Sequence, residues 1–519
     1  MRKPNLTLLA PLALLASSPP AWASDFVDTR VSFTFGDDDV LHESDTLQTV
    51  SPRPGFGERP GYQLFFENLN TRTTGRENEL HLVVYKKAPG FFPKLTTEAA
   101  VALRLDLVAL TSTAATGSKL MRDDGTYIRI AREIGAGNGE VVLFPLSTTR
   151  FRLGYLYALT WGDDEIFPKR LGPAPGLKLG FTQPWLRTFL GLKTATMQTV
   201  EPPVQQQTGE NLAISHPETF YGALGGVGTT VGKLDLDVGG GWFQMGDNEL
   251  SGVRGEPMTA VGGSGRVAWV DGIPVGLSAD LKLFRSDPEF LETLNRPERY
   301  PGGFDWSASL EGDYIVQTLQ DPDAGETQST TRQAAPAAAT IFRAKKGFWR
   351  FNLTGMVRSI EFMFHTRPSF VGGQALPEDA DIAPELFGAV AVDRYLARWR
   401  LTPGAQIGVQ RPASMTTRLD LATIGANPPA GDTGAQTLLI RADRSFTILP
   451  SGDEAVPIFA GKLSARWQVS PMVTLVGMAF ATLDQNAIDP RPSQFGTSER
   501  RLLDQPLILG AAAIAQARF

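Results

Sequence analysis

Hydrophobic and polar residues alternate with a period of two along much of this chain. In residues 150–161, the side that runs from Phe151 to Trp161 is entirely apolar, whereas the other side carries Arg150 and Arg152. Successive side chains of a β-strand point to opposite faces, so this period predicts a strand with one apolar face. A helix would place the two arginines within the apolar stripe.

The same alternation recurs over residues 101–107, 234–242, 275–283, 304–317, 349–358, 394–401, 459–469 and 507–519. Several of these segments are about 10–14 residues long, whereas strands in globular proteins have about 5–6. Tilted strands that cross a bilayer need about 9–11 residues. Tight turns are expected at 271–274, 345–347, 402–404 and 470–471, and longer polar loops lie between other strands.

These strands predict an all-β fold that spans a membrane. In hydrocarbon, every backbone N–H and C=O must be paired, which only helices and closed barrels achieve. No apolar run after residue 23 is long enough for a helical span. We therefore expect a transmembrane antiparallel β-barrel of about 16 strands, within a range of about 14–20.

The first residues have the composition of an export signal. Arg2 and Lys3 precede the apolar stretch 6–16, and Ala21-Trp22-Ala23 is an A-x-A cleavage site. Residues 1–23 are expected to be a signal peptide, and residues 61–519 the barrel. Residues 24–60 are expected to form a first strand, a periplasmic extension or a plug.

Composition excludes several classes of protein. The 519 residues carry 49 basic and 55 acidic side chains, so the net charge of −6 excludes a strongly basic nucleic-acid binder. The absence of cysteine excludes disulfides, thiol catalysis and cysteine-ligated metal. The four histidines form no H-E-x-x-H motif, and no G-x-S-x-G is present, so no enzymatic activity is expected. A barrel hydrolase using His81 or His365 is the lesser alternative.

Aromatic residues lie near the ends of the predicted strands on the apolar face. Amphipathic rings favour the membrane–water boundary, where they form girdles at both rims. A buried core of a soluble β-protein is the competing interpretation. The predicted interface aromatics are Tyr155, Tyr157, Trp161, Trp242, Trp269, Trp306, Trp349, Trp399 and Trp467.

Charged residues alternate with this apolar face and are expected to line a lumen. Arg394, Arg398 and Arg400 align on one predicted strand and would attract anionic solutes. Alternatively, these charges pair across adjacent strands and only solvate the interior. The predicted lumen residues are Arg150, Arg152, Arg350, Arg358, Arg394, Arg398, Arg400, Arg466, Asp235, Asp237, Asp280 and Glu311.

Two local motifs have structural rather than chemical interpretations. Asp37, Asp38 and Asp39 could bind Ca²⁺, but their spacing is not that of an EF-hand, and a solvated acidic turn is favoured. No other cofactor is expected. The glycine runs at 225–228 and 239–241 lie within strand patterns, where glycine marks kinks or close aromatic packing rather than a phosphate loop.

The last predicted strand ends at Phe519, with Ala517 where a second aromatic residue is usual. Together with the signal peptide and the lack of cysteine, this end resembles that of Gram-negative outer-membrane β-barrels, broadly porin-like. The resemblance implies an outer-membrane location, contact with lipid, and assembly by the barrel assembly machinery with Phe519 as signal. It implies a passive pore for small hydrophilic solutes, anionic ones among them; a non-conducting barrel for structure, adhesion or partner assembly is the alternative. The oligomeric state is left open.

Overall fold

A computed structural model describes most of the barrel and parts of its connections. The described residues are 28–37, 40–41, 76–107, 121–200, 204–205, 211–212, 215–248, 252–273, 303–324, 329–366, 373–378, 380–417, 436–440, 446–450, 452–492, 498–502 and 505–518. The predicted signal peptide, Asp38, Asp39, Asp280, Phe519 and the predicted strand at 275–283 lie outside these residues.

The main sheet closes on itself. Each strand pairs antiparallel with the next one around the ring, and β1 pairs with both β2 and β27. The ring strands are β1 (Asp28–Asp37), β2 (Arg76–Pro89), β3 (Leu95–Asp106), β5 (Tyr127–Ile134), β6 (Gly137–Phe144), β7 (Gly176–Thr182), β8 (Leu186–Val200), β11 (Ser215–Val231), β12 (Leu234–Asp247), β13 (Pro257–Asp271), β14 (Phe304–Gln320), β15 (Thr330–Lys346), β16 (Trp349–Arg358), β18 (Glu385–Arg394), β19 (Leu401–Arg411), β23 (Ile458–Gln468), β24 (Val473–Leu483) and β27 (Leu507–Arg518).

The ring contains 18 strands, close to the predicted number of about 16. The sheet has a nineteenth strand, β4 (Met121–Asp123). Both β4 and β5 pair with β3, so β4 shares the ring position of β5 and does not add to the count. Because β1 lies within residues 24–60, part of that segment is a barrel strand; the rest, except residues 40–41, lies outside the described residues.

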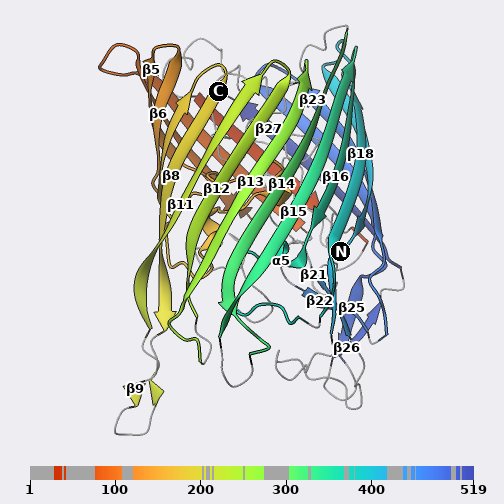
Figure 1. Ribbon diagram of the computed structural model, residues 1–519. Coiled ribbons are helices and arrows are strands. Elements are labelled where there is room, and N and C mark those ends of the chain that lie inside the picture. The colour runs from red at the N-terminus through yellow and green to blue at the C-terminus, as the bar shows by residue number, and fades with distance from the viewer. Residues whose placement is uncertain are drawn as a thin grey trace.

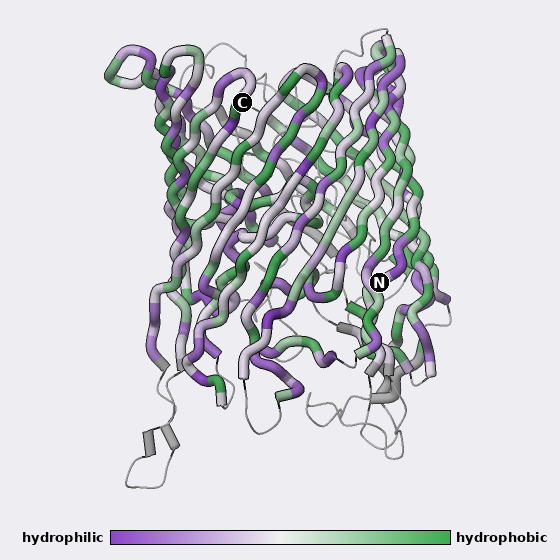
Figure 2. The backbone as a smooth tube through the Cα atoms, viewed as in Figure 1, coloured by the Kyte–Doolittle hydropathy of each residue, from purple (hydrophilic) through white to green (hydrophobic). Residues whose placement is uncertain are grey.

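The two faces of the ring have opposite character. On β14, the outward Leu310 is 60% exposed, whereas the adjacent inward Glu311 is 4% exposed. Figure 2 shows this alternation of green and purple along the front strands. No helix among the described residues is long and apolar enough to cross a membrane. A closed ring with an apolar exterior pairs all of its strand hydrogen bonds within hydrocarbon, so the fold is that of a transmembrane antiparallel β-barrel.

Short turns occupy one end of the barrel, and long connections other than the one between β13 and β14 occupy the opposite end (Figure 1). Two-residue turns join β5 to β6, β11 to β12 and β15 to β16. The long connections carry smaller elements, which are η3 (Tyr157–Leu159), η4 (Asp164–Ile166), β9 (Val204–Gln205), β10 (Asn211–Leu212), α5 (Ile360–Met363), β17 (Asp381–Ala383), β20 (Ser414–Thr417), β21 (Gln436–Ile440), β22 (Phe446–Ile448), β25 (Ile488–Pro492) and β26 (Ser498–Leu502). The predicted alternation of short turns and long loops is therefore confirmed for these connections.

Two local predictions near β19 are wrong. Residues 395–400, expected within a strand, form the turn between β18 and β19, and Arg400 takes a positive φ of 50° there. Residues 402–404, expected as a turn, lie inside β19 because Pro403 and Gly404 pair with β23 as ordinary strand residues. The proline–glycine signal was therefore misleading at this position.

Because the outer surface of the barrel faces lipid, a charged residue introduced there should destabilise the fold more than one introduced on the lumen side. We expect Leu310→Arg to destabilise the folded barrel by about 2–4 kcal/mol, because an outward arginine near the bilayer midplane enters hydrocarbon. Reversible urea unfolding in lipid vesicles measures this difference. Ser309→Arg, one position along β14 on the lumen side, is the matched control. Equal destabilisation by both changes would contradict the assigned faces.

Candidate functional site

The connection between β6 and β7, residues 145–175, folds into the barrel and is called the interior segment below. Leu153 and Trp161 form a short antiparallel bridge, followed by η4, whose N-cap Asp163 accepts a hydrogen bond from the backbone N–H of Glu165. The prediction of one barrel strand over 150–161 is therefore wrong. Its apolar side chains meet the inner wall of the barrel instead of lipid.

Apolar contacts fix the interior segment on this wall. The ring of Phe151 stacks on Phe144 of β6, with centroids 5.4 Å apart. Trp161 is fully buried, lies edge-on to Phe243 of β12 at 5.8 Å, and donates from Nε1 to Ser264 Oγ at 2.8 Å. These residues belong to the largest buried cluster of the described chain.

Glycines in the wall make room for the segment. A Cβ at Gly239 would lie 2.7 Å from Leu153 Cδ2, and one at Gly191 would overlap the ring of Phe151. The expected close aromatic packing occurs at Gly226, where a Cβ would lie 2.6 Å from the ring of Phe189, whereas the neighbour of Gly239 is aliphatic. Here the close neighbour is a segment that crosses the lumen rather than an adjacent strand.

Two charged wall residues hold the tip of the segment. Glu311 of β14 accepts from the backbone N–H of Tyr155 at 2.6 Å and from that of Leu156 at 2.7 Å, one bond to each carboxylate oxygen. Arg358 of β16 donates to the carbonyl oxygen of Ala158 at 3.0 Å. Because β14 and β16 lie several strands around the ring from β6, these bonds tie the segment to a distant part of the wall.

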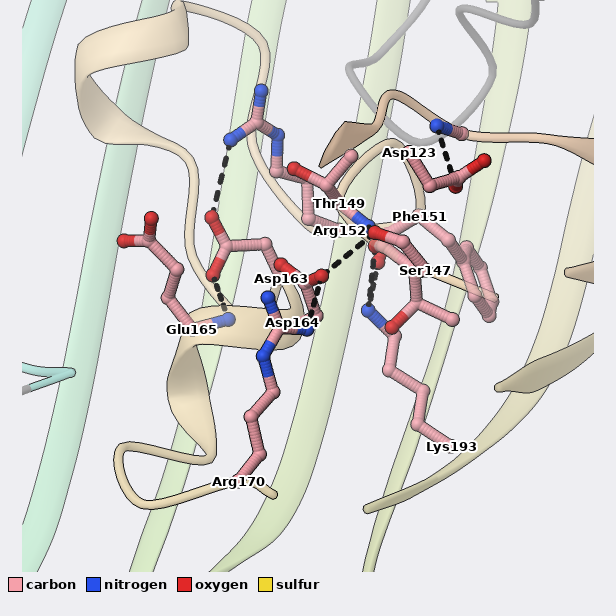
Figure 3. Close-up of polar contacts among 12 residues, drawn as sticks. Asp123, Ser147, Thr149, Phe151, Arg152, Asp163, Asp164, Glu165, Arg170 and Lys193 are labelled. Atoms are coloured by element: carbon pink, nitrogen blue, oxygen red, sulfur yellow. Dashed lines mark hydrogen bonds and ion pairs between the residues drawn. The ribbon is translucent and has the colours of Figure 1, made fainter. Parts of the chain in front are cut away.

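Ion pairs within the interior segment stabilise its fold (Figure 3). Arg152 contacts Asp163 at 3.3 Å, and both side chains are buried. Asp164 accepts a hydrogen bond from Ser147 at 2.7 Å and pairs with Arg170. Arg152 is thus an inner charge, as predicted, but it is paired with an acid of its own segment.

Lys193 of β8 binds the base of the segment and was not predicted from the sequence. Its ammonium donates to the carbonyl oxygens of Gly162 at 2.5 Å, Thr148 at 3.3 Å and Phe151, and its side chain is about 1% exposed. Figure 3 shows it pointing from β8 toward the backbone at Phe151. The sequence could have indicated that Lys193 faces inward, because it follows the lipid-facing Leu192 on the same strand.

Asp124 joins the start of the interior segment to the wall. Its carboxylate contacts Arg150 at 2.8 Å, Arg104 at 2.9 Å and His81 at 3.1 Å, all of them buried. Arg150 is therefore an inner charge, as predicted, that is held by an acid. His81, one of the two histidines considered for a hydrolase, belongs to this network.

The other inner arginines of the prediction also face acids. Arg350 donates through two nitrogens to Asp393 Oδ2, at 2.6 and 2.9 Å. Arg358 pairs with Glu385 at 2.5 Å. The acids Asp235 and Asp237 share Arg187 and Arg266, two basic residues that the prediction did not name. The pairing alternative accounts for these charges.

The predicted arginine ladder does not line the lumen. Arg394 is exposed on the outward face of β18 and lies 5.1 Å from the ring centroid of Trp349. Arg398 and Arg400 are exposed in the turn between β18 and β19. Arg466 alternates with the outward Trp467 on β23 and is partly exposed on the inner side. The proposed alignment of the first three arginines is therefore wrong.

The predicted interface aromatics divide into two groups. Trp161 and Tyr155 lie in the interior segment, the latter under Arg266 with 4.0 Å between the guanidinium carbon and the ring centroid, so their assignment to the membrane interface is wrong. Tyr157 begins η3 in the same segment. The remaining residues are at least partly exposed, and their place at the membrane boundary stays a prediction: Trp242, Trp269, Trp306, Trp349, Trp399 and Trp467.

The described residues contain no group of three or more acidic or histidine side chains arranged to hold a metal ion. Asp37 ends β1, and its side chain, like Asp38 and Asp39, lies outside the description. The Ca²⁺ assignment therefore remains an untested prediction.

No family model and no curated protein matches this chain. Among solved structures, it is similar to the outer membrane protein OpdK from Pseudomonas aeruginosa (10% identity, 95% of this chain and 98% of that chain, TM-score 0.41) and to OccAB3 from Acinetobacter baumannii (7%, 95% and 98%, TM-score 0.43). It is also similar to Wzi of Escherichia coli, described as a carbohydrate-binding β-barrel involved in group 1 capsule assembly (12%, 100% and 90%, TM-score 0.40).

Proposed function

We propose that this protein is an outer-membrane channel for passive diffusion of small hydrophilic solutes, narrowed by the interior segment. The observation that carries the proposal is the segment's attachment through Glu311, Arg358 and Lys193 to wall strands spread around the ring. A ring of this size encloses an aqueous lumen unless something fills it. An anchored segment would reduce that lumen to a defined constriction.

Charges on the inner wall support a wet lumen. Inward positions carry arginine, lysine, aspartate and glutamate on many strands, and burying such charges without water or a partner is costly. Because most of these arginines contact an acid, their charges are largely neutralised, and the proposal assigns selectivity to the size and polarity of the constriction. It assigns no catalytic role.

Single-channel recording in planar bilayers tests this function. The mature protein is expected to give stable open channels in potassium chloride. A reconstituted, heat-modifiable barrel that leaves the bilayer sealed would contradict the proposal.

A non-conducting barrel is the second candidate function. It is favoured by apolar clusters in the long connections, where Ile360, Met363 and Met415 pack together and Leu439 packs with Ile458 and Ile488. Such packing could close the loop end of the barrel and present a surface to a partner. A sealed bilayer in the same recording would favour this candidate.

The ion pairs predict how charge selectivity can be changed. We expect Asp393→Asn to shift the reversal potential in a salt gradient toward anions, because Arg350 then loses the acid that it contacts. Replacing Arg394, Arg398 and Arg400 together with alanine is expected to have little effect, since they lie outside the lumen. A large shift from the triple change and none from Asp393→Asn would contradict this assignment.

A further inference from the structure

We propose that the inner face of β16, β18 and β19 holds a subsite for a neutral, hydroxyl-rich solute such as an oligosaccharide. This inference rests on the proposed channel function and names the class of solute that the channel would bind. It is carried by buried side-chain amide atoms on the inner wall that lack hydrogen-bond partners.

The strand register places these amides together. Asn352 of β16 and Gln406 of β19 both pair with Ala391 of the intervening β18, so they lie in one row across the three strands. Gln410 lies one inward position beyond Gly408 on β19 and opposite Phe387 of β18. The alternation with exposed Ile407 and Val409 shows that Gln406 and Gln410 face inward.

Each of these three amides has at least one atom without a hydrogen-bond partner. Gln406 is 3% exposed, yet neither its Oε1 nor its Nε2 has a partner. The Oε1 of Gln410 and the Oδ1 of Asn352 also lack partners, although both side chains are buried. A buried polar atom without a partner costs about 1–3 kcal/mol, so a ligand that supplies the missing bonds would be bound favourably.

The inward side chains beside these amides are mostly small, and they offer little net charge. The inward neighbours Ala389, Ala391 and Gly404 are small, and Phe387 adds an apolar ring beside Gln410. The nearby charges are already used: Arg350 pairs with Asp393, and Glu385 binds both Arg358 and Gln410. Lys462, opposite Gln406 on β23, also has a contact of its own.

This chemistry fits hydroxyl groups better than ions. An amide offers both an acceptor and two donors, and a hydroxyl likewise donates and accepts, so the two types of group pair in either direction. A carboxylate accepts only, and would leave the unpartnered amide oxygens without donors. A small apolar face beside the amides suits the C–H side of a sugar ring.

Binding of maltotriose to the mature protein in detergent tests the subsite without requiring an open pore. Isothermal titration is expected to show saturable binding, weakened about tenfold by Gln406→Leu, which removes both amide partners. Gln516→Leu makes the same change on the inner side of β27 and is expected to bind like the unmodified protein. Maltotrionate, in which the reducing-end carbon is oxidised to a carboxylate, is expected to bind less tightly.

The outcomes separate the subsite from the channel. Absence of maltotriose binding, or equal affinities for Gln406→Leu and Gln516→Leu, would overturn the subsite. Maltotriose binding that depends on Gln406 in a barrel that seals planar bilayers would support the subsite and overturn the channel function. Preferred binding of maltotrionate would overturn the assignment to neutral solutes.

Discussion

Glu311→Ala is expected to produce a second, larger conductance level in single-channel recordings. The carboxylate accepts two backbone N–H groups from the tip of the interior segment, one on each oxygen. Hydrogen bonds to a charged group contribute about 1.5–3 kcal/mol each, so their loss would weaken docking by about 3 kcal/mol or more. That changes the ratio of docked to undocked segment on the order of 100-fold.

Two variants make this measurement specific. Glu311→Gln keeps one acceptor oxygen and is expected to show the larger level less often. Asp393→Asn removes a lumen carboxylate that contacts Arg350 rather than the segment, and is expected to keep a single level. Heat-modifiable migration checks that each barrel folds. If folded Glu311→Ala channels had unchanged conductance, the interior segment would not form the constriction.

The barrel itself could be predicted from the sequence because its signal is local. Alternation along a single strand, as on β14 and β23, fixes which side chains face outward whatever the partner strand is. Closure follows from the need to pair backbone groups in hydrocarbon. Neither argument requires knowledge of which strands are neighbours.

The interior segment could not be identified in this way because period two does not reveal what the apolar face contacts. Phe151, Leu153 and Trp161 alternate as they would on a lipid-facing strand, but they pack on Phe144, Gly239 and Phe243. The complementary signal lies in the wall, where inward positions such as Phe243 and Gly239 are not polar. Only the strand register shows that these positions share a face with the segment.

The pairing of inner charges could not be decided from the sequence either, because it too depends on the strand register. Arg350 and Asp393 are direct partners across β16 and β18, and so are Arg358 and Glu385. The sequence separates the members of each pair by a long connection that contains α5. Opposite charges in register stabilise one another, so Arg350 and Arg358 of the predicted lumen set are largely neutralised.

Lys193→Met is expected to release the base of the interior segment while leaving the barrel closed. The ammonium is fully buried and donates to three carbonyl oxygens of the segment, those of Thr148, Phe151 and Gly162. Methionine fills a similar volume but donates nothing, so three buried carbonyl groups lose a partner. Each such loss costs about 1–3 kcal/mol, enough to favour local opening.

Limited trypsin digestion in detergent, followed by mass spectrometry, measures this opening. The segment contains Arg150 and Arg152, both buried while the segment is docked, and they become cleavable when it leaves the wall. Lys178→Met is the matched control, because Lys178 is equally buried on the adjacent β7 but pairs with Glu140 of β6 rather than with the segment. Rapid cleavage after Arg150 and Arg152 is expected in Lys193→Met alone. Equal resistance in both variants would mean that the contacts of Glu311 and the apolar wall hold the segment without the lysine.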